Sequence, residues 1–272
     1  MVEVKSTSAN HDETYLELVR GALRVCLNYK PSCGQGRIGG VTLEEFQRLY
    51  REDEFYSWFG LDSPLVYAAH KAAGGMTSIY RQIGISCQIL FQRVLQDTLN
   101  LSSADATWSY KIPANKGKSR TLSLDGRIPI ESVAKSPRRS MVEMWLKDAW
   151  LHLGLKGRNT ANPRGAVFEV RQGYKSNDAK RQNADVSNAS SAYAYHYLPV
   201  MLLLSVQIPG NLAERYRRAR WLILRGTVSG SSVDSTYVFC RDVLGYDLAG
   251  FFRRNSSAIK KETLAVLEGL LR

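Results

Sequence analysis

The chain has 272 residues and 44% hydrophobic content, so it can bury the core of one large domain or of a domain with a helical annex. This composition argues against intrinsic disorder, and no apolar run approaches the roughly 20 residues needed to span a bilayer. The formal net charge of +12 favours a polyanionic partner, because clustered Lys and Arg gain affinity by displacing counterions from phosphates.

The cysteines and histidines do not form a metal-binding pattern. The four cysteines have no CxxC spacing, and the four histidines lie far apart, so a structural zinc site is not expected. The first residues lack the charged and apolar segments of a secretory signal. We therefore expect a reduced, cytoplasmic protein without a membrane segment or an organic cofactor.

The first hundred residues are predicted to be helical. Asp12 or Thr14 is a candidate cap for the first helix, and Thr42 with Glu45 forms a capping-box pattern before an apolar run. After a break at the adjacent glycines 74 and 75, a long amphipathic helix is expected to open at Thr77.

This pattern divides the chain into two regions. Residues 1–76 are expected to be a helical N-terminal region that supplies recognition or dimer contacts. Residues 77–272 are expected to form an α/β core with C-terminal helices.

The second region alternates strands with helices. WSYKI and RTLSLDGRI are predicted to form a hairpin around the polar loop PANKGKS, and a helix is expected over about 140–153. A strand around Glu169, a helix over about 178–197, the buried strand YLPVMLLLSVQI, the basic helix AERYRRA and the strand RWLILRGTV follow. The predicted fold class is α/β (α+β), with a mixed central sheet flanked by helices.

Two acids stand out among the predicted strands. Alternation of side chains places Val167, Glu169 and Arg171 on one face of their strand. Asp125 lies at a bend caused by Gly126 between strand residues. Two acids on neighbouring strands could bind one divalent cation, although Glu169 and Arg171 could also form an ion pair in a non-catalytic sheet. Asp125 could equally be a simple turn residue.

Cations are dense around these acids. Residues 111 to 139 hold eight of them against only Asp125 and Glu131: Lys111, Lys116, Lys118, Arg120, Arg127, Lys135, Arg138 and Arg139. A second polar group follows Glu169 at a predicted helix start, where phosphates and base edges are commonly contacted: Lys180, Arg181, Gln182 and Asn183. We expect Lys116, Lys118 and this second group to bind DNA, although a solvated helix face would have the same composition.

The order of a helix, a strand with Asp125, a strand with Glu169, a basic helix and a buried strand resembles the core of the PD-(D/E)xK nucleases. The stretch 166–185, AVFEVRQGYKSNDAKRQNAD, resembles type II restriction endonucleases, and the resemblance covers roughly residues 77–226. It implies a restriction-endonuclease-like fold in which Asp125 and Glu169 bind Mg²⁺. It also implies a lysine two residues beyond the second acid that positions or deprotonates the attacking water.

The chain departs from this pattern at several positions. Leu124 replaces the proline, the acids lie far apart in sequence, and Arg171 stands where the lysine is expected. A guanidinium stays protonated and cannot act as a base, but it can stabilise charge on the phosphate. Lys175 is an alternative cation if Gly173 bends the strand, because six extended residues would place it about 20 Å from Glu169.

A literal DxK triplet, Asp178-Ala179-Lys180, offers another alternative. It follows the apolar strand instead of lying within it, and Asp178 is better placed as a helix N-cap. We therefore rank it below Glu169 and Arg171.

The resemblance implies a Mg²⁺-dependent type II restriction endonuclease that hydrolyses double-stranded DNA at a specific short sequence. A palindromic target requires two copies of one active site, so a homodimer is expected. One alternative is a non-enzymatic DNA-binding protein with a degenerate nuclease fold, for which Arg171 in place of lysine argues. Another is a structure-specific resolvase or repair nuclease, which would show the same acids.

Overall fold

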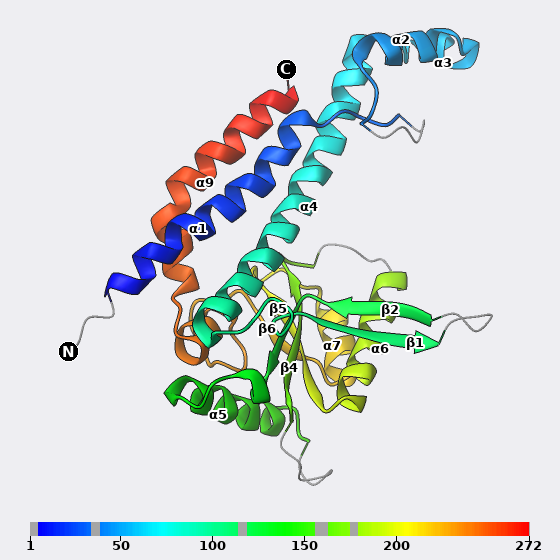
Figure 1. The fold of residues 1–272 in the computed structure, drawn as a ribbon. Coiled ribbons are helices and arrows are strands. Elements are labelled where there is room, and N and C mark those ends of the chain that lie inside the picture. Colours follow the sequence, from blue (N-terminus) through cyan, green and yellow to red (C-terminus); the bar gives the residue numbers. More distant parts are fainter. Residues whose placement is uncertain (1–4, 34–38, 114–118, 156–162, 175–178, 272) are drawn as a thin grey trace. The chain divides into compact units, whose positions relative to one another are not determined.

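The computed structural model describes residues 5–33, 39–113, 119–155, 163–174 and 179–271. The chain forms two compact units (Figure 1). The α/β unit comprises Met1–Ser8 and Cys87–Arg253, and the helical unit comprises Ala9–Ser86 and Arg254–Arg272. This division differs from the boundary at residue 76 suggested by the sequence, because the end of the chain groups with the N-terminal helices.

The helical unit combines parts of long helices with shorter ones. Its elements are most of α1 (Lys5–Arg24), the 3₁₀ helix η1 (Val25–Asn28), α2 (Leu43–Arg51), α3 (Glu54–Trp58), the first part of α4 (Pro64–Leu99) and most of α9 (Leu248–Leu271). The predicted capping box at Thr42 and Glu45 is confirmed, with hydrogen bonds in both directions. The predicted helix start at Asp12 or Thr14 is wrong, because α1 begins at Lys5.

Ion pairs join α1 to α9 within the helical unit. Arg20 and Arg24 donate to Glu262 over 2.7 and 2.9 Å. Arg254 donates to Asp12 over 2.7 Å, so Asp12 serves as an ion-pair partner in place of a helix cap. These contacts connect segments more than 230 residues apart in sequence.

The helix break predicted at Gly74 and Gly75 is wrong, because α4 continues through both residues. A Cβ atom on Gly74 would lie 1.8 Å from the hydroxyl oxygen of Tyr29, and one on Gly75 would lie 2.7 Å from a methyl carbon of Leu270. The absence of a side chain at these two positions therefore lets Tyr29 and Leu270 pack closely against α4. The usual cost of glycine inside a helix, about 0.5–1 kcal/mol, is offset by these contacts.

The α/β unit contains a four-stranded mixed sheet and a separate hairpin. The sheet has the order β3 (Gly126–Pro129), β4 (Gly165–Arg171), β5 (Tyr197–Leu203) and β6 (Leu222–Leu224). β3 is antiparallel to β4, whereas β4, β5 and β6 are parallel. The predicted hairpin is confirmed as β1 (Trp108–Pro113) and β2 (Ser119–Leu124). The predicted strand RTLSLDGRI is therefore divided at Asp125 between two sheets.

Helices cover both faces of the sheet (Figure 1). α6 (Ala179–Ala194) and α7 (Gly210–Arg218) connect the parallel strands and pack on the face that carries Val167. On the opposite face Phe168 contacts Phe91 of α4, Trp145 of α5 (Pro137–His152) and Phe239. The remaining elements are η3 (Ile130–Ser132), α8 (Thr236–Val238) and the π-helix η4 (Phe239–Leu244).

β4 and β5 form the centre of this core. Almost every residue of the two strands is buried, as parallel strands covered on both faces require. The mixed α/β class predicted from the sequence is confirmed. Within the described residues, no helix combines the length and the apolarity that crossing a membrane would need.

Close packing at Gly74 makes a testable prediction. We expect Gly74→Ala to lower the free energy of unfolding by roughly 1–3 kcal/mol, because the new methyl group must displace the Tyr29 ring. Urea denaturation followed by circular dichroism measures the change.

Gly84→Ala is the matched control in the same helix, since nothing lies within 4 Å of its added Cβ. That control should be stabilising by up to about 1 kcal/mol. Equal effects of the two substitutions would contradict the packing role.

Candidate functional site

Asp125 is fixed between the hairpin and the central sheet. It follows β2 directly and precedes β3, whose first residue, Gly126, pairs with Phe168 of β4. The backbone N–H of Val170 donates to Asp125 Oδ2 over 2.8 Å, and the Gln88 side-chain amide donates to Oδ1. Gln92 donates to the Asp125 backbone carbonyl over 2.5 Å. Two glutamines one turn apart on α4 and one backbone N–H of β4 therefore hold this residue.

Glu169 and Arg171 face each other on β4. The Arg171 Nη2 atom lies 2.5 Å from Glu169 Oε1, so the two side chains share a face of the strand, as the alternation predicts. The Glu169 side chain is 10% exposed and that of Arg171 is 13% exposed. The structure thus brings Asp125, Glu169 and Arg171 together beside the β3–β4 edge.

A third acid, which the sequence did not suggest, completes this group. Asp185 lies on α6, and its Oδ1 atom is 3.3 Å from Arg171 Nη2. Its Oδ2 atom accepts hydrogen bonds from the hydroxyls of Tyr174 and Tyr216 over 2.7 and 2.6 Å. We call Asp125, Glu169, Asp185 and Arg171 the acid–arginine cluster. Because it holds three carboxyl groups and one guanidinium, it is acidic when fully ionised.

Burial is the main control on protonation within the cluster, and repulsion between the acids adds to it. Burial, opposed by Arg171 and reinforced by repulsion from Asp125 and Asp185, raises the pKa of Glu169 to about 8. Burial also raises the pKa of Asp125, although the Val170 N–H and Arg171 oppose that shift. Asp125 and Glu169 interact, so their protons belong to the pair. A cation entering the cluster would displace a proton.

The donor set fits Mg²⁺. This ion is usually held through one or two carboxylates, waters and substrate phosphates, and Asp125 and Glu169 supply two such carboxylates. Binding of a divalent cation would require Glu169 to lose the proton that it otherwise holds up to about pH 8. Within the described ranges, no group of three or more His, Cys, Asp or Glu side chains is arranged to hold a metal, and a Mg²⁺ site of this kind does not need one.

Several cationic side chains that were expected to surround the acids instead make hydrogen bonds or ion pairs within the chain. Arg127 donates to the carbonyl oxygens of Ala104 and Asp105, and Arg138 donates to that of Val243. Arg139 pairs with Glu143 and also donates to a backbone carbonyl. Lys111 and Lys135 are exposed. The remaining expected cations, Lys116, Lys118 and Lys175, lie outside the described residues, as do Asp178 and the side chain of Arg120.

The predicted DNA-binding group lies at the start of α6. Lys180 and Arg181 are exposed. The Arg215 guanidinium of α7 donates to Gln182 Oε1 over 2.7 Å and also to the side-chain oxygen of Asn183. The four residues therefore divide into an exposed cationic pair and an amide pair oriented by Arg215.

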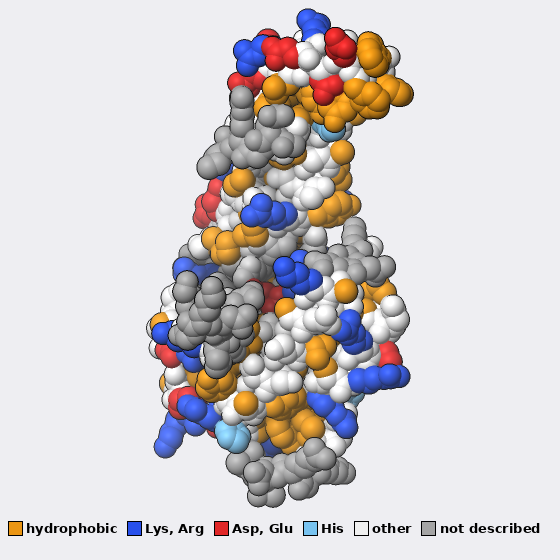
Figure 2. Space-filling view, turned by 90° about the vertical axis from the view of Figure 1, so that its right-hand side faces the viewer, with side chains coloured by type: hydrophobic (Ala, Val, Ile, Leu, Met, Phe, Trp, Pro, Cys, Tyr) orange, Lys and Arg blue, Asp and Glu red, His pale blue; other side chains and the backbone are white. Residues whose placement is uncertain are grey.

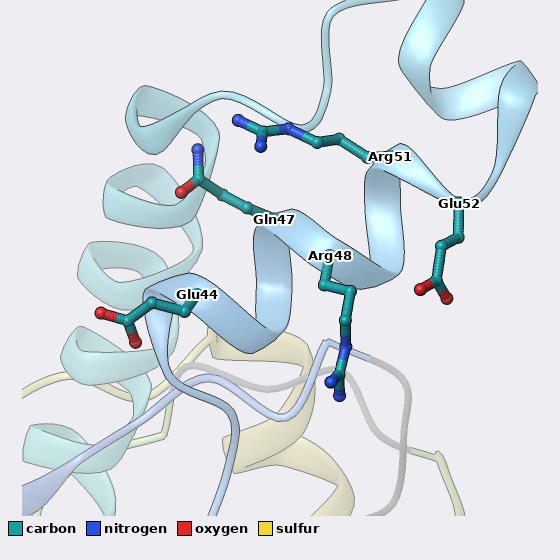
Figure 3. A pocket seen from close by; sticks show the side chains of 5 residues that line it. All are labelled: Glu44, Gln47, Arg48, Arg51 and Glu52. Atoms are coloured by element: carbon teal, nitrogen blue, oxygen red, sulfur yellow. The ribbon is translucent and has the colours of Figure 1, made fainter.

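A hollow in the helical unit has different chemistry. It is lined by residues of α2 and its C-cap that carry both charges and one amide: Glu44, Gln47, Arg48, Arg51 and Glu52 (Figure 3). Its side chains spread outward from one helix, and the Arg51 guanidinium pairs with Asp62 over 3.1 Å. The hollow lacks the buried, converging acids of the acid–arginine cluster.

Asp185 was detectable in principle from helix periodicity. The buried face of α6 consists of Asp185, Asn188, Ala189 and Ala192, spaced as one helical stripe. An acid on an otherwise small, buried stripe requires a partner, which is a signal for a site. Gln88 and Gln92 carried no such signal, because polar residues are common on exposed helix faces.

No protein-family model, curated protein or solved structure matches this chain.

The raised pKa of Glu169 predicts a pH-dependent stability. Folded Glu169 keeps its proton to about pH 8, whereas the unfolded residue releases it near 4.5. Between these values the folded state binds more protons, so the Glu169 contribution to the free energy of unfolding falls as pH rises. The slope is at most about 1.4 kcal/mol per pH unit.

Urea unfolding of metal-free protein at pH 5 and pH 8 measures this slope. Glu169→Gln should remove the Glu169 contribution, while Glu143→Gln, at an exposed ion pair, should leave it unchanged. An unaltered slope in Glu169→Gln would show that Glu169 does not carry the proton.

Proposed function

We propose that this protein is a Mg²⁺-dependent endonuclease of the type II restriction class, which hydrolyses double-stranded DNA at a specific short sequence. The observation that carries the proposal is the meeting of Asp125 and Glu169 beside the β3–β4 pair, with Arg171 in contact with Glu169. This combination of two carboxylates and one permanent cation suits metal-assisted phosphodiester hydrolysis. A restriction-endonuclease-like arrangement of the mixed sheet belongs to the same proposal.

Each residue of the cluster has a role that follows from its chemistry. Asp125 and Glu169 would hold the metal, and bound Mg²⁺ would supply an activated water and charge neutralisation at the scissile phosphate. Arg171 remains protonated and therefore cannot act as a general base. Its guanidinium is suited to stabilising the negative charge that develops on the phosphate.

The distribution of charge favours DNA binding by the α/β unit. This unit carries 25 Lys and Arg residues against 14 Asp and Glu, whereas the helical unit carries 12 against 11. Lys and Arg side chains outnumber acids on the face of the α/β unit shown in Figure 2, and both charges occur together in the helical unit. Nearly all of the net charge of +12 therefore belongs to the unit that holds the acid–arginine cluster.

The helical unit offers a different kind of surface. Its α3 helix and the residue after it expose large aromatic side chains, with Phe55, Trp58 and Phe59 exposed by 58%, 76% and 67%. We propose a homodimer because one cluster per chain addresses one strand of a duplex.

We also propose that the protein acts in the cytoplasm and uses no organic cofactor.

A non-enzymatic DNA-binding protein is the second candidate. Arg171 in place of a lysine favours it, as does the short contact between Arg171 and Glu169, which would suit a purely structural ion pair. A structure-specific nuclease would share the acids but would cut branched DNA in preference to linear duplexes.

Cleavage assays separate these functions. With Mg²⁺, the wild-type protein should cut a sequenced phage genome into discrete fragments. Asp125→Asn and Glu169→Gln should each slow cleavage at least about 10²-fold, because a bound metal supplies several kcal/mol of transition-state stabilisation.

Duplex affinity should stay close to that of the wild type, since neither change removes a cation. Glu143→Gln is the control and should cleave normally. Unchanged cleavage by Asp125→Asn would remove this residue from the mechanism, and binding without any cleavage would favour the second candidate.

The exposed pair at the start of α6 makes a prediction about DNA binding. If Lys180 and Arg181 contact phosphates, each alanine substitution should weaken binding of a random-sequence duplex and reduce the salt slope by about 1. Fluorescence anisotropy across a salt series measures both quantities. Lys261→Ala, an exposed position of the nearly neutral helical unit, should change neither. Identical slopes for all three variants would place the phosphate contacts elsewhere.

A further inference from the structure

A buried polar group lies behind Arg171 and is not among the residues proposed to hold Mg²⁺. Asp185 is 3% exposed, and its Oδ2 atom accepts hydrogen bonds from two tyrosine hydroxyls, Tyr174 and Tyr216. The two hydroxyl oxygens also lie 2.5 Å apart. The Asp185 backbone carbonyl accepts from Trp221 Nε1 over 3.1 Å. The carboxylate is therefore held from several directions.

The other oxygen of Asp185 faces the guanidinium. Glu169 and Asp185 both approach Arg171 Nη2, one from the same strand and one from α6. The Tyr174 ring lies beside the guanidinium, with its centroid 5.8 Å from the Cζ atom. Two acids and one ring thus restrict both the position and the plane of the guanidinium.

One donor of Arg171 is not used by this arrangement. The Nε atom is buried, and it has no hydrogen-bond partner within the part of the chain that the structure describes. Buried N–H groups are normally paired, so this donor lacks an acceptor, which a bound group could supply. The missing partner must be a hydrogen-bond acceptor, and a guanidinium N–H favours a negatively charged oxygen.

We infer that Asp185, clamped by Tyr174 and Tyr216, is a positioning residue that holds Arg171 so that its Nε–H binds a phosphate oxygen. The inference rests on the proposed function, which identifies that phosphate as the one hydrolysed in DNA. Asp185 acts through Arg171 and does not itself touch the substrate. The two tyrosines act one step further away, through Asp185.

Cleavage kinetics give the first test. Asp185→Asn keeps the size of the side chain but removes its charge, so the maximal cleavage rate should fall about 10²-fold, as expected when a catalytic group is misplaced. Tyr216→Phe removes one hydroxyl and should cause a smaller loss. Because the loss follows from misplacement, the KM for DNA should change much less than kcat in both variants.

Tyr110→Phe is the matched control. The Tyr110 hydroxyl donates to Asn188 over 2.6 Å, in a buried hydrogen bond on the same face of α6, but it does not contact Arg171. This variant should lose stability in the same way as Tyr216→Phe and keep the wild-type kcat. Equal losses of kcat in Tyr110→Phe and Tyr216→Phe would show that Asp185 and its tyrosines have a general structural role, and would overturn the inference.

A measurement without catalysis separates this inference from the proposed function. The Nε–H resonance of Arg171, assigned by its loss in Arg171→Lys, can be followed by ¹⁵N NMR during titration with inorganic phosphate. It should shift saturably in the wild type and in Tyr110→Phe, and at least about tenfold more phosphate should be needed in Asp185→Asn. That response in a protein that does not cleave DNA would support Asp185 as a positioning residue while refuting the nuclease proposal. An unresponsive resonance, or equal affinity in Asp185→Asn, would overturn the positioning role whatever the cleavage result.

Discussion

Three buried or partly buried carboxyl groups around a single guanidinium are the constraint on which the α/β unit depends. The Glu169 and Asp185 oxygens lie 2.5 and 3.3 Å from Arg171 Nη2, while Asp125 binds the backbone of the same strand. The low dielectric of the interior strengthens attraction and repulsion together, so the acids cannot all be ionised at little cost. The raised pKa of Glu169 expresses this conflict.

The fold delivers each member of the cluster from a different element. β3 pairs antiparallel with β4 and brings Asp125 to Val170, while α4 supplies Gln88 to the same carboxylate. The crossover from β4 through α6 to β5 returns Asp185 to the face that carries Arg171. The site is therefore a product of tertiary packing, and loss of the β3–β4 register would displace Asp125 from β4.

Sequence periodicity predicts the features of the site that depend only on local structure, namely side-chain direction and bends. The alternation of β4 places Glu169 and Arg171 on one face, and Gly126 marks the bend at Asp125. Gln88 could not be predicted, because its role arises only when α4 meets a residue 37 positions later. The glycines of α4 favour a helix break in the sequence pattern, whereas in the fold Gly74 allows close approach of Tyr29 from another segment.

Two features of this cluster favour the proposed function over a purely structural ion pair. Replacing a buried pair by well-packed apolar residues is often neutral or stabilising, so stability alone does not favour such a group. A structural pair would also balance its charges and satisfy its donors, yet the cluster has excess carboxylate and leaves Arg171 Nε without a partner among the described residues. The orphaned donor costs about 1–3 kcal/mol. A divalent cation would balance the excess carboxylate, and a phosphate oxygen would accept from Arg171 Nε. The proposed metal-assisted hydrolysis would bring both ligands to one place.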